Sequence, residues 1–246
     1  MAIRPATLGD LSAITGVVLE TLSTEATWKD HFPPKARQDA KYIQYTETIL
    51  RRYLDPTNED YMVTVVEVTD QGRCQSKPQI VSVAVWGMSF AKTGKQGQSD
   101  SLRKDVAPGD DIIPNMPEAT DDCSMAKVIA VTNAIPEGRN KYFGSTSHIF
   151  LHILATKPDR QKRGYAKALC KWGMEFARKK DVVIALLTSP RGYIFFSGLG
   201  FVDVGALHLP VGHENGEHLL KAMLFDPKRA PRHGSFVDQL LHYLSS

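Results

Sequence analysis

The stretch Gln161-Lys162-Arg163-Gly164-Tyr165-Ala166 has the residue types of an anion-binding turn at the start of a helix. Small residues at a helix N-terminus let a ligand approach backbone N–H groups that lack partners within the helix, and the helix dipole adds positive potential there. Gly164 leaves the tightest point of the turn without a side chain. The pattern predicts a phosphate site; a glycine and an alanine used only for helix packing are the alternative interpretation.

The charge distribution supports a polyanionic ligand for this stretch. Residues 157–180 contain nine Lys or Arg against two acidic residues, a local charge of +7, although the whole chain carries only +3. A small polyanion fits this pattern better than a nucleic acid, whose backbone is bound by more extensive basic surfaces. A solvated helix face is the alternative interpretation of the same charges.

A strand, a helix and a second strand must position the turn. Residues 147–156 are apolar and predict a buried central strand that ends at Lys157-Pro158. Residues 181–187 predict a second buried strand, parallel to the first. The segment between them predicts a helix, because its apolar residues recur at helical spacing: Ala166, Leu169, Cys170, Gly173, Phe176 and Ala177.

The whole chain predicts one α/β domain over residues 1–246, since it has no internal repeat and no second composition regime. The other expected elements are a strand at 3–7, a helix from about 10 to 22, a helix at about 35–54, an antiparallel hairpin with strands at 61–68 and 80–88, a loop insertion at 89–117, a helix from 121 to about 138, a short helix at 189–199, strands starting at 200 and at 219, and a C-terminal helical extension at 226–246.

Composition and cysteine usage exclude several classes of protein. With 42% hydrophobic and 23% charged residues, the chain is neither disordered nor fibrous. Its three cysteines form no C-x-x-C pair, so neither a disulfide framework nor a zinc site is indicated, and we expect no metal. The N-terminus lacks a signal-peptide core, and no apolar run is long enough to span a membrane. We therefore expect a soluble, cytoplasmic protein that binds neither nucleic acid nor membrane.

Several of these features together resemble the GNAT (Gcn5-related) N-acetyltransferase superfamily, whereas the chain contains neither G-x-x-x-x-G-K-[ST] nor G-x-G-x-x-G. They are the strand at 150–156, the Gln-x-x-Gly-x-Ala motif that starts at Gln161, the next strand, and Gly200-Phe201. The resemblance is specific over residues 149–204, and the start of the chain at 3–10 is similar as well. Trp172-Gly173 is similar to the motif helix of fungal small-molecule members. The implied fold is a mixed, partly splayed central β-sheet flanked by helices.

The resemblance implies acetyl-coenzyme A as co-substrate. Backbone groups of Leu154, Ala155 and Thr156 are then expected to bind the pantetheine arm, where the strands at 150–156 and 182–187 splay apart. Ser189 is expected to contact pantetheine, with a helix N-cap as the alternative role. The family's pyrophosphate loop corresponds to Gln161, Lys162, Arg163, Gly164, Tyr165, Ala166 and Lys167.

Acetyl transfer by direct attack of an amine needs a base for the ammonium, and His152 is the candidate. Its imidazole titrates near neutral pH, and strand alternation places it on the same face as His148, Phe150 and Leu154. A histidine that is hydrogen-bonded in the core, or that only shapes the pocket, is the alternative.

The departing thiolate needs an acid, and the family's usual tyrosine position is occupied by Phe196, which has no hydroxyl. Tyr193 lies three residues earlier and is the candidate for this role. Ser197, a water molecule, or no enzyme acid at all are the alternatives. Phe196 itself is expected to contact the cofactor.

The acceptor is expected to be a small-molecule amine in a protein that is a monomer or a homodimer. A protein or peptide acceptor, and a coenzyme A sensor that has lost catalysis, are the alternatives. In this fold, substrate choice depends on the first two helices and on the segment before the central strand. The candidates for an aromatic acceptor pocket are Trp28, Asp30, His31, Phe32, Tyr142, Phe143 and His148.

Overall fold

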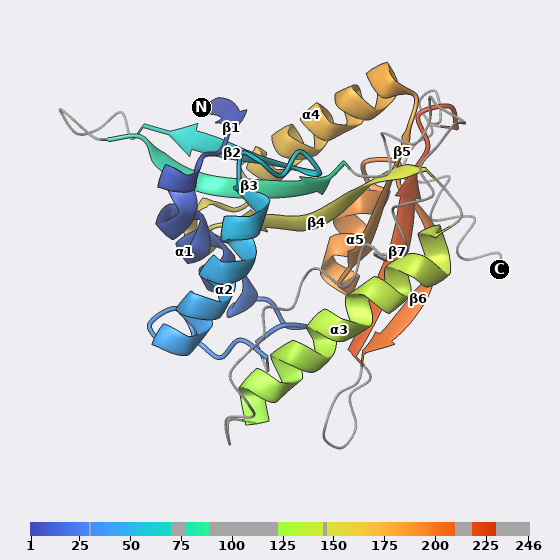
Figure 1. Cartoon of the computed structure of the whole chain (residues 1–246). Coiled ribbons are helices and arrows are strands. Elements are labelled where there is room, and N and C mark those ends of the chain that lie inside the picture. Colours follow the sequence, from blue (N-terminus) through green and yellow to red (C-terminus); the bar gives the residue numbers. More distant parts are fainter. Residues whose placement is uncertain (30, 70–76, 89–122, 145–146, 210–217, 230–246) are drawn as a thin grey trace.

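Seven strands form one sheet in the order β1-β2-β3-β4-β5-β7-β6 in the computed structural model (Figure 1), which describes residues 1–29, 31–69, 77–88, 123–144, 147–209 and 218–229. Every neighbouring pair is antiparallel except β4 and β5, which are parallel. The bounds are β1 Ala2–Pro5, β2 Tyr61–Val68, β3 Gln79–Gly87, β4 His148–Thr156, β5 Val183–Thr188, β6 Val202–Leu209 and β7 His218–Phe225.

Helices cover both faces of the sheet and make the domain a three-layer mixed α/β structure. In Figure 1, α1, α2 and α3 lie below the sheet and α4 lies above it. The α5 helix lies on the α4 side, because Phe196 shares one core cluster with Leu169 of α4. The bounds are α1 Leu11–Leu22, α2 Ala40–Tyr53, α3 Cys123–Phe143, α4 Tyr165–Lys180 and α5 Pro190–Ser197.

The strand, helix and strand expected around the anion-binding turn are confirmed as β4, α4 and β5, and the two strands are parallel. The antiparallel hairpin is confirmed as β2 and β3. The insertion expected at 89–117 lies outside the described residues. So does the extension expected at 226–246, apart from a turn at 226–229.

The α2 and α3 helices differ from expectation for identifiable reasons. The α2 helix begins at Ala40 rather than near Lys35, because the Asp39 side chain accepts a hydrogen bond from the Lys41 backbone N–H and caps the helix there. The expected end of α3 at Gly138 is also wrong. A Cβ at Gly138 would lie 2.5 Å from Leu207 Cδ2, so this glycine permits close packing on β6 instead of ending the helix.

Each sheet face has its own core. The face under α4 buries Trp86 against the helix, and a Cβ at Gly173 would lie 2.3 Å from the Trp86 ring. The glycine of the Trp172-Gly173 pair therefore lets α4 approach the sheet closely. The opposite face buries the apolar sides of α1 and α2 on β2 and β3. Within the described residues, no helix has the length and hydropathy needed to span a bilayer.

Candidate active site

The β4 and β5 strands pair only along the first part of β4. His148 to Leu151 pair with Val183 to Leu186, whereas β3 continues to pair with β4 as far as Thr156. From residue 152 onward, β4 therefore has a sheet partner on one side only. A strand edge of this kind leaves backbone N–H and C=O groups for a ligand.

A β-bulge coincides with the point where the two strands separate. Trp86 pairs with Leu151 and Val85 pairs with Ile153, which leaves His152 as the extra residue. A bulge bends its strand and increases the local twist, and it re-aims side chains. The sequence contains no glycine or proline at this position that would have indicated the bulge.

The bulge changes which face the following side chains occupy. His152 contacts Phe150 and His148 contacts Phe150, so these three share a face as expected. Leu154, however, packs against the core under α4, on the other face. The expectation that His152 and Leu154 share a face is therefore wrong, because a one-residue bulge shifts the alternation.

A cleft of about 590 Å³ opens where the strands separate. It is lined by β4, the turn before α4, the end of β5 and the start of α5, with α1 and the residues after it on the other side. Most of the residues expected to bind coenzyme A line this cleft: Leu154, Ala155, Thr156, Gln161, Lys162, Gly164, Tyr165, Ala166, Lys167, Ser189 and Phe196.

The turn before α4 leaves the N-terminus of that helix open. Gly164 has a φ of 84° and Lys162 a φ of 60°, both in the left-handed region. A Cβ at Gly164 would meet nothing within 4 Å, so the space beside the helix N-terminus is open. The basic residues that line the cleft are Arg160, Lys162, Lys167 and Arg191.

Gln161 connects the turn to the neighbouring elements. Its Nε2 donates to the Thr156 carbonyl oxygen at 3.2 Å, and its Oε1 accepts from Arg191 Nη2 at 3.0 Å. Sequence reasoning missed Arg191. The feature of the sequence that could have indicated Arg191 is its place in the first turn of a short helix. The helix dipole disfavours a cation there unless an anion is bound.

Glu25, on the other side of the cleft, was also missed. Its Oε2 is buried and has no hydrogen-bond partner among the described residues, so it is available to a bound group. An isolated acidic residue after an apolar helix carries no sequence signal for such a role.

Two predicted residues lie outside the lining of the cleft. Arg163 is exposed, and its Nη2 lies 3.5 Å from the Asp159 carbonyl oxygen. The Tyr193 ring lies 5.7 Å from Lys221 Nζ, so the structure does not bring this phenol into the cleft.

Phe196 does line the cleft and is only 5% exposed. Ser189 is the N-cap of α5, and its Oγ accepts a hydrogen bond from the Gly192 N–H at 3.3 Å. Ser189 therefore caps the helix and also lines the cleft.

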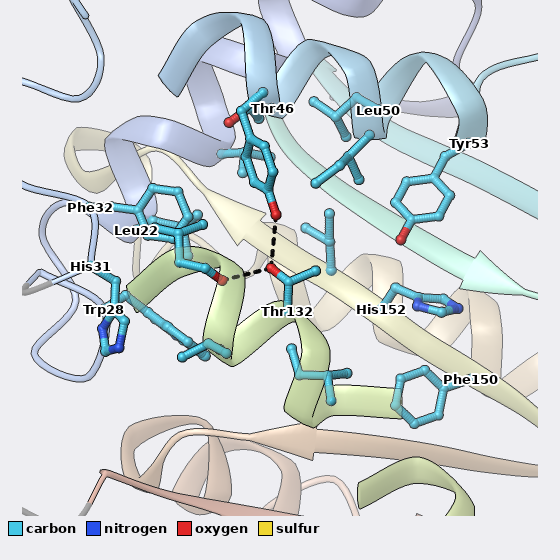
Figure 2. Close-up of a pocket in the computed structure, with 17 residues that line it drawn as sticks. Leu22, Trp28, His31, Phe32, Thr46, Leu50, Tyr53, Thr132, Phe150 and His152 are labelled. Atoms are coloured by element: carbon cyan, nitrogen blue, oxygen red, sulfur yellow. Dashed lines mark hydrogen bonds between the residues drawn. The ribbon is translucent and has the colours of Figure 1, made fainter. Parts of the chain in front are cut away.

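A second, smaller cavity of about 200 Å³ lies between α1, α2 and α3 and adjoins the cleft (Figure 2). Trp28, His31 and Phe32 line it, as expected. The residues that line both cavities, and so mark their junction, are Val18, Leu22, Trp28, His152 and Ile153. We call the smaller cavity the aromatic pocket.

The other pocket candidates have different positions. Tyr142 hydrogen-bonds to the backbone of Ala206, which fixes the end of α3 on β6. Phe143 and His148 are buried against Phe150 and do not line the aromatic pocket. Asp30 lies outside the described residues.

Two tyrosines of α2 line the aromatic pocket but were missed by sequence reasoning, namely Tyr45 and Tyr53. Tyr42 lies three residues before Tyr45, and Tyr53 lies eight residues after Tyr45, so all three tyrosines recur on one helix face. This spacing is a signal that could have found them.

His152 lies at one side of the aromatic pocket, beside Tyr53 and Phe150 in Figure 2. Its ring centroid is 4.9 Å from that of Phe150 and 5.5 Å from those of Tyr53 and Tyr61. A Cβ at Gly87 would lie 2.6 Å from its Nε2, so the glycine makes room for the imidazole. Among the described residues, this Nε2 has no hydrogen-bond partner.

This environment keeps the His152 imidazole neutral. Burial, reinforced by the positive charge of Arg139 and by His148, lowers the pKa of His152 to about 3. The ring is therefore a free base at neutral pH but has little affinity for a proton.

Comparison with known proteins finds a family model that matches part of the chain. Residues 119–201 match the model of the Acetyltransferase (GNAT) family. The chain matches no curated protein sequence significantly. A crystal structure of histone acetyltransferase HPA2 and related acetyltransferase from Corynebacterium glutamicum is similar with a TM-score of 0.50 and 18% identity, over 96% of this chain and 98% of that chain. A crystal structure of an agmatine N-acetyltransferase mutant in the apo form has a TM-score of 0.52 and 10% identity, over 92% and 98%.

At these identities the two solved structures show the fold alone. The family match is more informative, because it spans β4, the anion-binding turn, α4, β5 and α5. The seven-stranded sheet flanked by helices is consistent with the GNAT fold, and the family match covers residues 119–201 of it.

Proposed function

We propose that the chain is an acetyl-coenzyme A-dependent N-acetyltransferase that acetylates the amine of a small molecule in a ternary complex. One observation carries the proposal: a cleft with a basic, open helix N-terminus shares lining residues with an apolar pocket at the point where β4 and β5 separate. The cleft accounts for the donor and the pocket for the acceptor.

The residues of the cleft fit coenzyme A chemically. Backbone groups of Leu154, Ala155 and Thr156 on the open edge of β4 are proposed to pair with the pantetheine amides. N–H groups of the turn at 161–167 are proposed to bind the pyrophosphate. Arg160, Lys162, Lys167 and Arg191 then offset the charge of its phosphates.

Acetyl-coenzyme A supplies the thioester, and the residues of the chain hold the acceptor amine in position to attack it. The acceptor amine, held at the junction of the two cavities, attacks the carbonyl carbon directly, with no covalent intermediate on the enzyme. For His152 we propose a positioning role. The pKa of His152 is about 3, whereas the pKa of an acceptor ammonium is near 10. Proton transfer from the ammonium to His152 is therefore strongly unfavourable. The base role predicted from sequence is the alternative, and a pH profile separates the two.

Protonation of the departing thiolate has no assigned residue in this proposal. Tyr193 stays a prediction, although its ring lies toward Lys221 rather than in the cleft. Ser197 and water are the other sources of the proton. Oligomeric state and cytoplasmic location also stay predictions.

The direct test is release of free thiol from acetyl-coenzyme A in the presence of amines. We expect release to depend on both the protein and an amine, with a product heavier than the amine by one acetyl group. Initial rates at varied concentrations of both substrates should show an intersecting pattern. A parallel pattern would contradict direct attack in a ternary complex.

A coenzyme A sensor without catalysis is the second candidate function, and Phe196 favours it. Phe196→Tyr restores a hydroxyl at a position that lines the cleft. If the missing acid limits the enzyme, kcat should rise by about 10-fold or more while acetyl-coenzyme A affinity is unchanged. Unchanged turnover would show that the lost hydroxyl is not limiting.

A further inference from the structure

We propose that the acceptor is an arylalkylamine, whose ring binds in the aromatic pocket and whose amine lies at the junction with the cleft. The inference rests on the proposed function and deepens it by naming the substrate class. It is carried by the size and lining of the pocket, by the charge beside it, and by the residues that the two cavities share.

The aromatic pocket has the size and walls for one ring with a short chain. An apolar cavity of about 150 Å³ suffices to bind benzene, and this pocket measures about 200 Å³. Aromatic side chains from different elements form its walls, so a bound ring has partners for edge-to-face contacts. They are Trp28, Phe32, Tyr45, Tyr53 and Phe150.

The polar groups at the centre of the wall bond to one another. Thr132 Oγ1 donates to the Val128 carbonyl oxygen at 2.9 Å, so the Tyr45 hydroxyl is the donor in its 2.9 Å bond to Thr132. These bonds are drawn in Figure 2. Among the described residues that line the pocket, none is Asp, Glu, Lys or Arg. A second ammonium placed there would lose its water without gaining a charged partner.

A buried positive charge lies beside the pocket. The Arg139 guanidinium carbon is 4.9 Å from the centre of the Phe150 ring, and Phe150 lines the pocket. Arg139 is only 4% exposed, and a guanidinium stays charged at neutral pH. Its field disfavours a polycation and favours the uncharged form of an amine, which is the form that attacks a carbonyl. Polyamines and lysine-rich peptides are therefore poor candidates.

The junction places the amine at the site of reaction. His152 and Ile153 line both cavities and belong to the part of β4 that has separated from β5. A ring bound in the pocket would present the amine of a short alkyl chain at this junction. The new bond joins the amine nitrogen to the acetyl carbon, and the carbon–sulfur bond breaks. One proton leaves the nitrogen and one proton reaches the sulfur, so the products are an acetamide and coenzyme A thiol.

The experiment compares 2-phenylethylamine and tryptamine with putrescine and a lysine-containing peptide, using acetyl-coenzyme A and the full chain. We expect kcat/KM for the two arylalkylamines to exceed that for the other two acceptors by at least about 100-fold, because a desolvated second charge is costly. Calorimetric titration with acetyl-coenzyme A and with 2-phenylethylamine accompanies the kinetics.

Variants that fill the pocket locate the ring. Ile49→Trp and Ile135→Trp change residues that line the pocket but not the cleft. Each should lower kcat/KM for 2-phenylethylamine by at least about 10-fold while acetyl-coenzyme A affinity is retained, which also shows that the variant is folded. Thr48→Trp is the matched control, since Thr48 is exposed on the same helix and lines neither cavity. It should leave both quantities unchanged.

The outcomes separate the inference from the proposed function. Absence of acetyl-coenzyme A binding would overturn both. Acetyl-coenzyme A binding with preferred turnover of putrescine or the peptide would overturn only the substrate class. The substrate class would also be overturned if 2-phenylethylamine were neither bound nor turned over. Full activity toward 2-phenylethylamine in both pocket variants would overturn it as well.

Discussion

His152, the residue predicted from sequence as the catalytic base, lies in an environment that keeps its imidazole neutral at neutral pH. It is the extra residue of the β4 bulge, it lines both cavities, and three aromatic rings surround it. Burial lowers its pKa to about 3. The sequence could predict a histidine on the central strand, but not this environment, because the surrounding rings come from α2, β2 and β4.

The pH profile of kcat/KM tests its role. Since His152 is already neutral above about pH 3, we expect no limb near pH 6.5. The rate should instead rise toward the pKa of the acceptor ammonium, near 10. A limb near pH 6.5 that disappears in His152→Ala would restore the base role. In that case His152→Ala should lower kcat/KM by roughly 10²–10⁴ at neutral pH.

Gly164 tests the anion-binding turn at the level of one residue. Gly164→Leu fills the open space beside the α4 N-terminus, and we expect the Kd for acetyl-coenzyme A to rise at least about 100-fold, because the loss of two charge-assisted hydrogen bonds amounts to about 3 kcal/mol. Calorimetric titration measures the change.

Gly200→Leu is the matched control for backbone strain. Gly200 has a φ of 90° and open surroundings but does not line the cleft. Both variants carry a similar strain of about 1–2 kcal/mol. Equal loss of acetyl-coenzyme A affinity in the two would refute a specific role for Gly164.

At the scale of elements, the sequence predicts the parts with strong periodicity and misses single-residue irregularities. The β4-α4-β5 unit was predictable, because apolar runs and a helical stripe flank the turn. The bulge at His152 was not predictable, since an uninterrupted apolar strand gives no sign of a one-residue shift in pairing. The predicted helix end near Gly138 is wrong, because only the structure shows Leu207 packed against this glycine.

Close packing of α4 on the sheet depends on Gly173. Gly173→Ala places a methyl group against the Trp86 ring, and we expect a loss of about 1–3 kcal/mol in the free energy of unfolding. For a chain of this size, each kcal/mol lowers Tm by about 2–4 °C. Thermal unfolding followed by circular dichroism measures the change.

Gly16→Ala is the control for this substitution, because a Cβ at Gly16 in α1 would meet nothing within 4 Å. It should be neutral or slightly stabilising, as expected for alanine in a helix. A Gly173→Ala variant as stable as the wild type would contradict the packing argument.

At the scale of the whole molecule, stability should fall in acid through two separate groups. The unfolded chain protonates His152 near pH 6.5 whereas the folded chain does not until about pH 3, so unfolding takes up a proton between these values. Asp10 affects stability at lower pH, because hydrogen bonds from Arg4 lower its pKa to about 2. Its contribution to the free energy of unfolding is lost as the pH falls from about 4 through 2.

Urea unfolding of the wild type and two variants separates these windows. Between about pH 6.5 and about 4.5, the free energy of unfolding should fall by up to about 1.4 kcal/mol per pH unit from His152 alone. His152→Phe should remove this part of the slope, and Arg4→Met should leave it in place while removing the part below about pH 4. An unchanged slope in His152→Phe would show that the imidazole is not buried in its neutral form.

Calorimetric titration of the wild-type chain with acetyl-coenzyme A alone tests the central claim most directly, because it needs no acceptor. The open β4 edge, the turn at 161–167 and the basic residues of the cleft together predict one site with a Kd in the micromolar range or tighter. No binding by a folded sample would contradict the account and would leave the turn as a structural feature without a ligand.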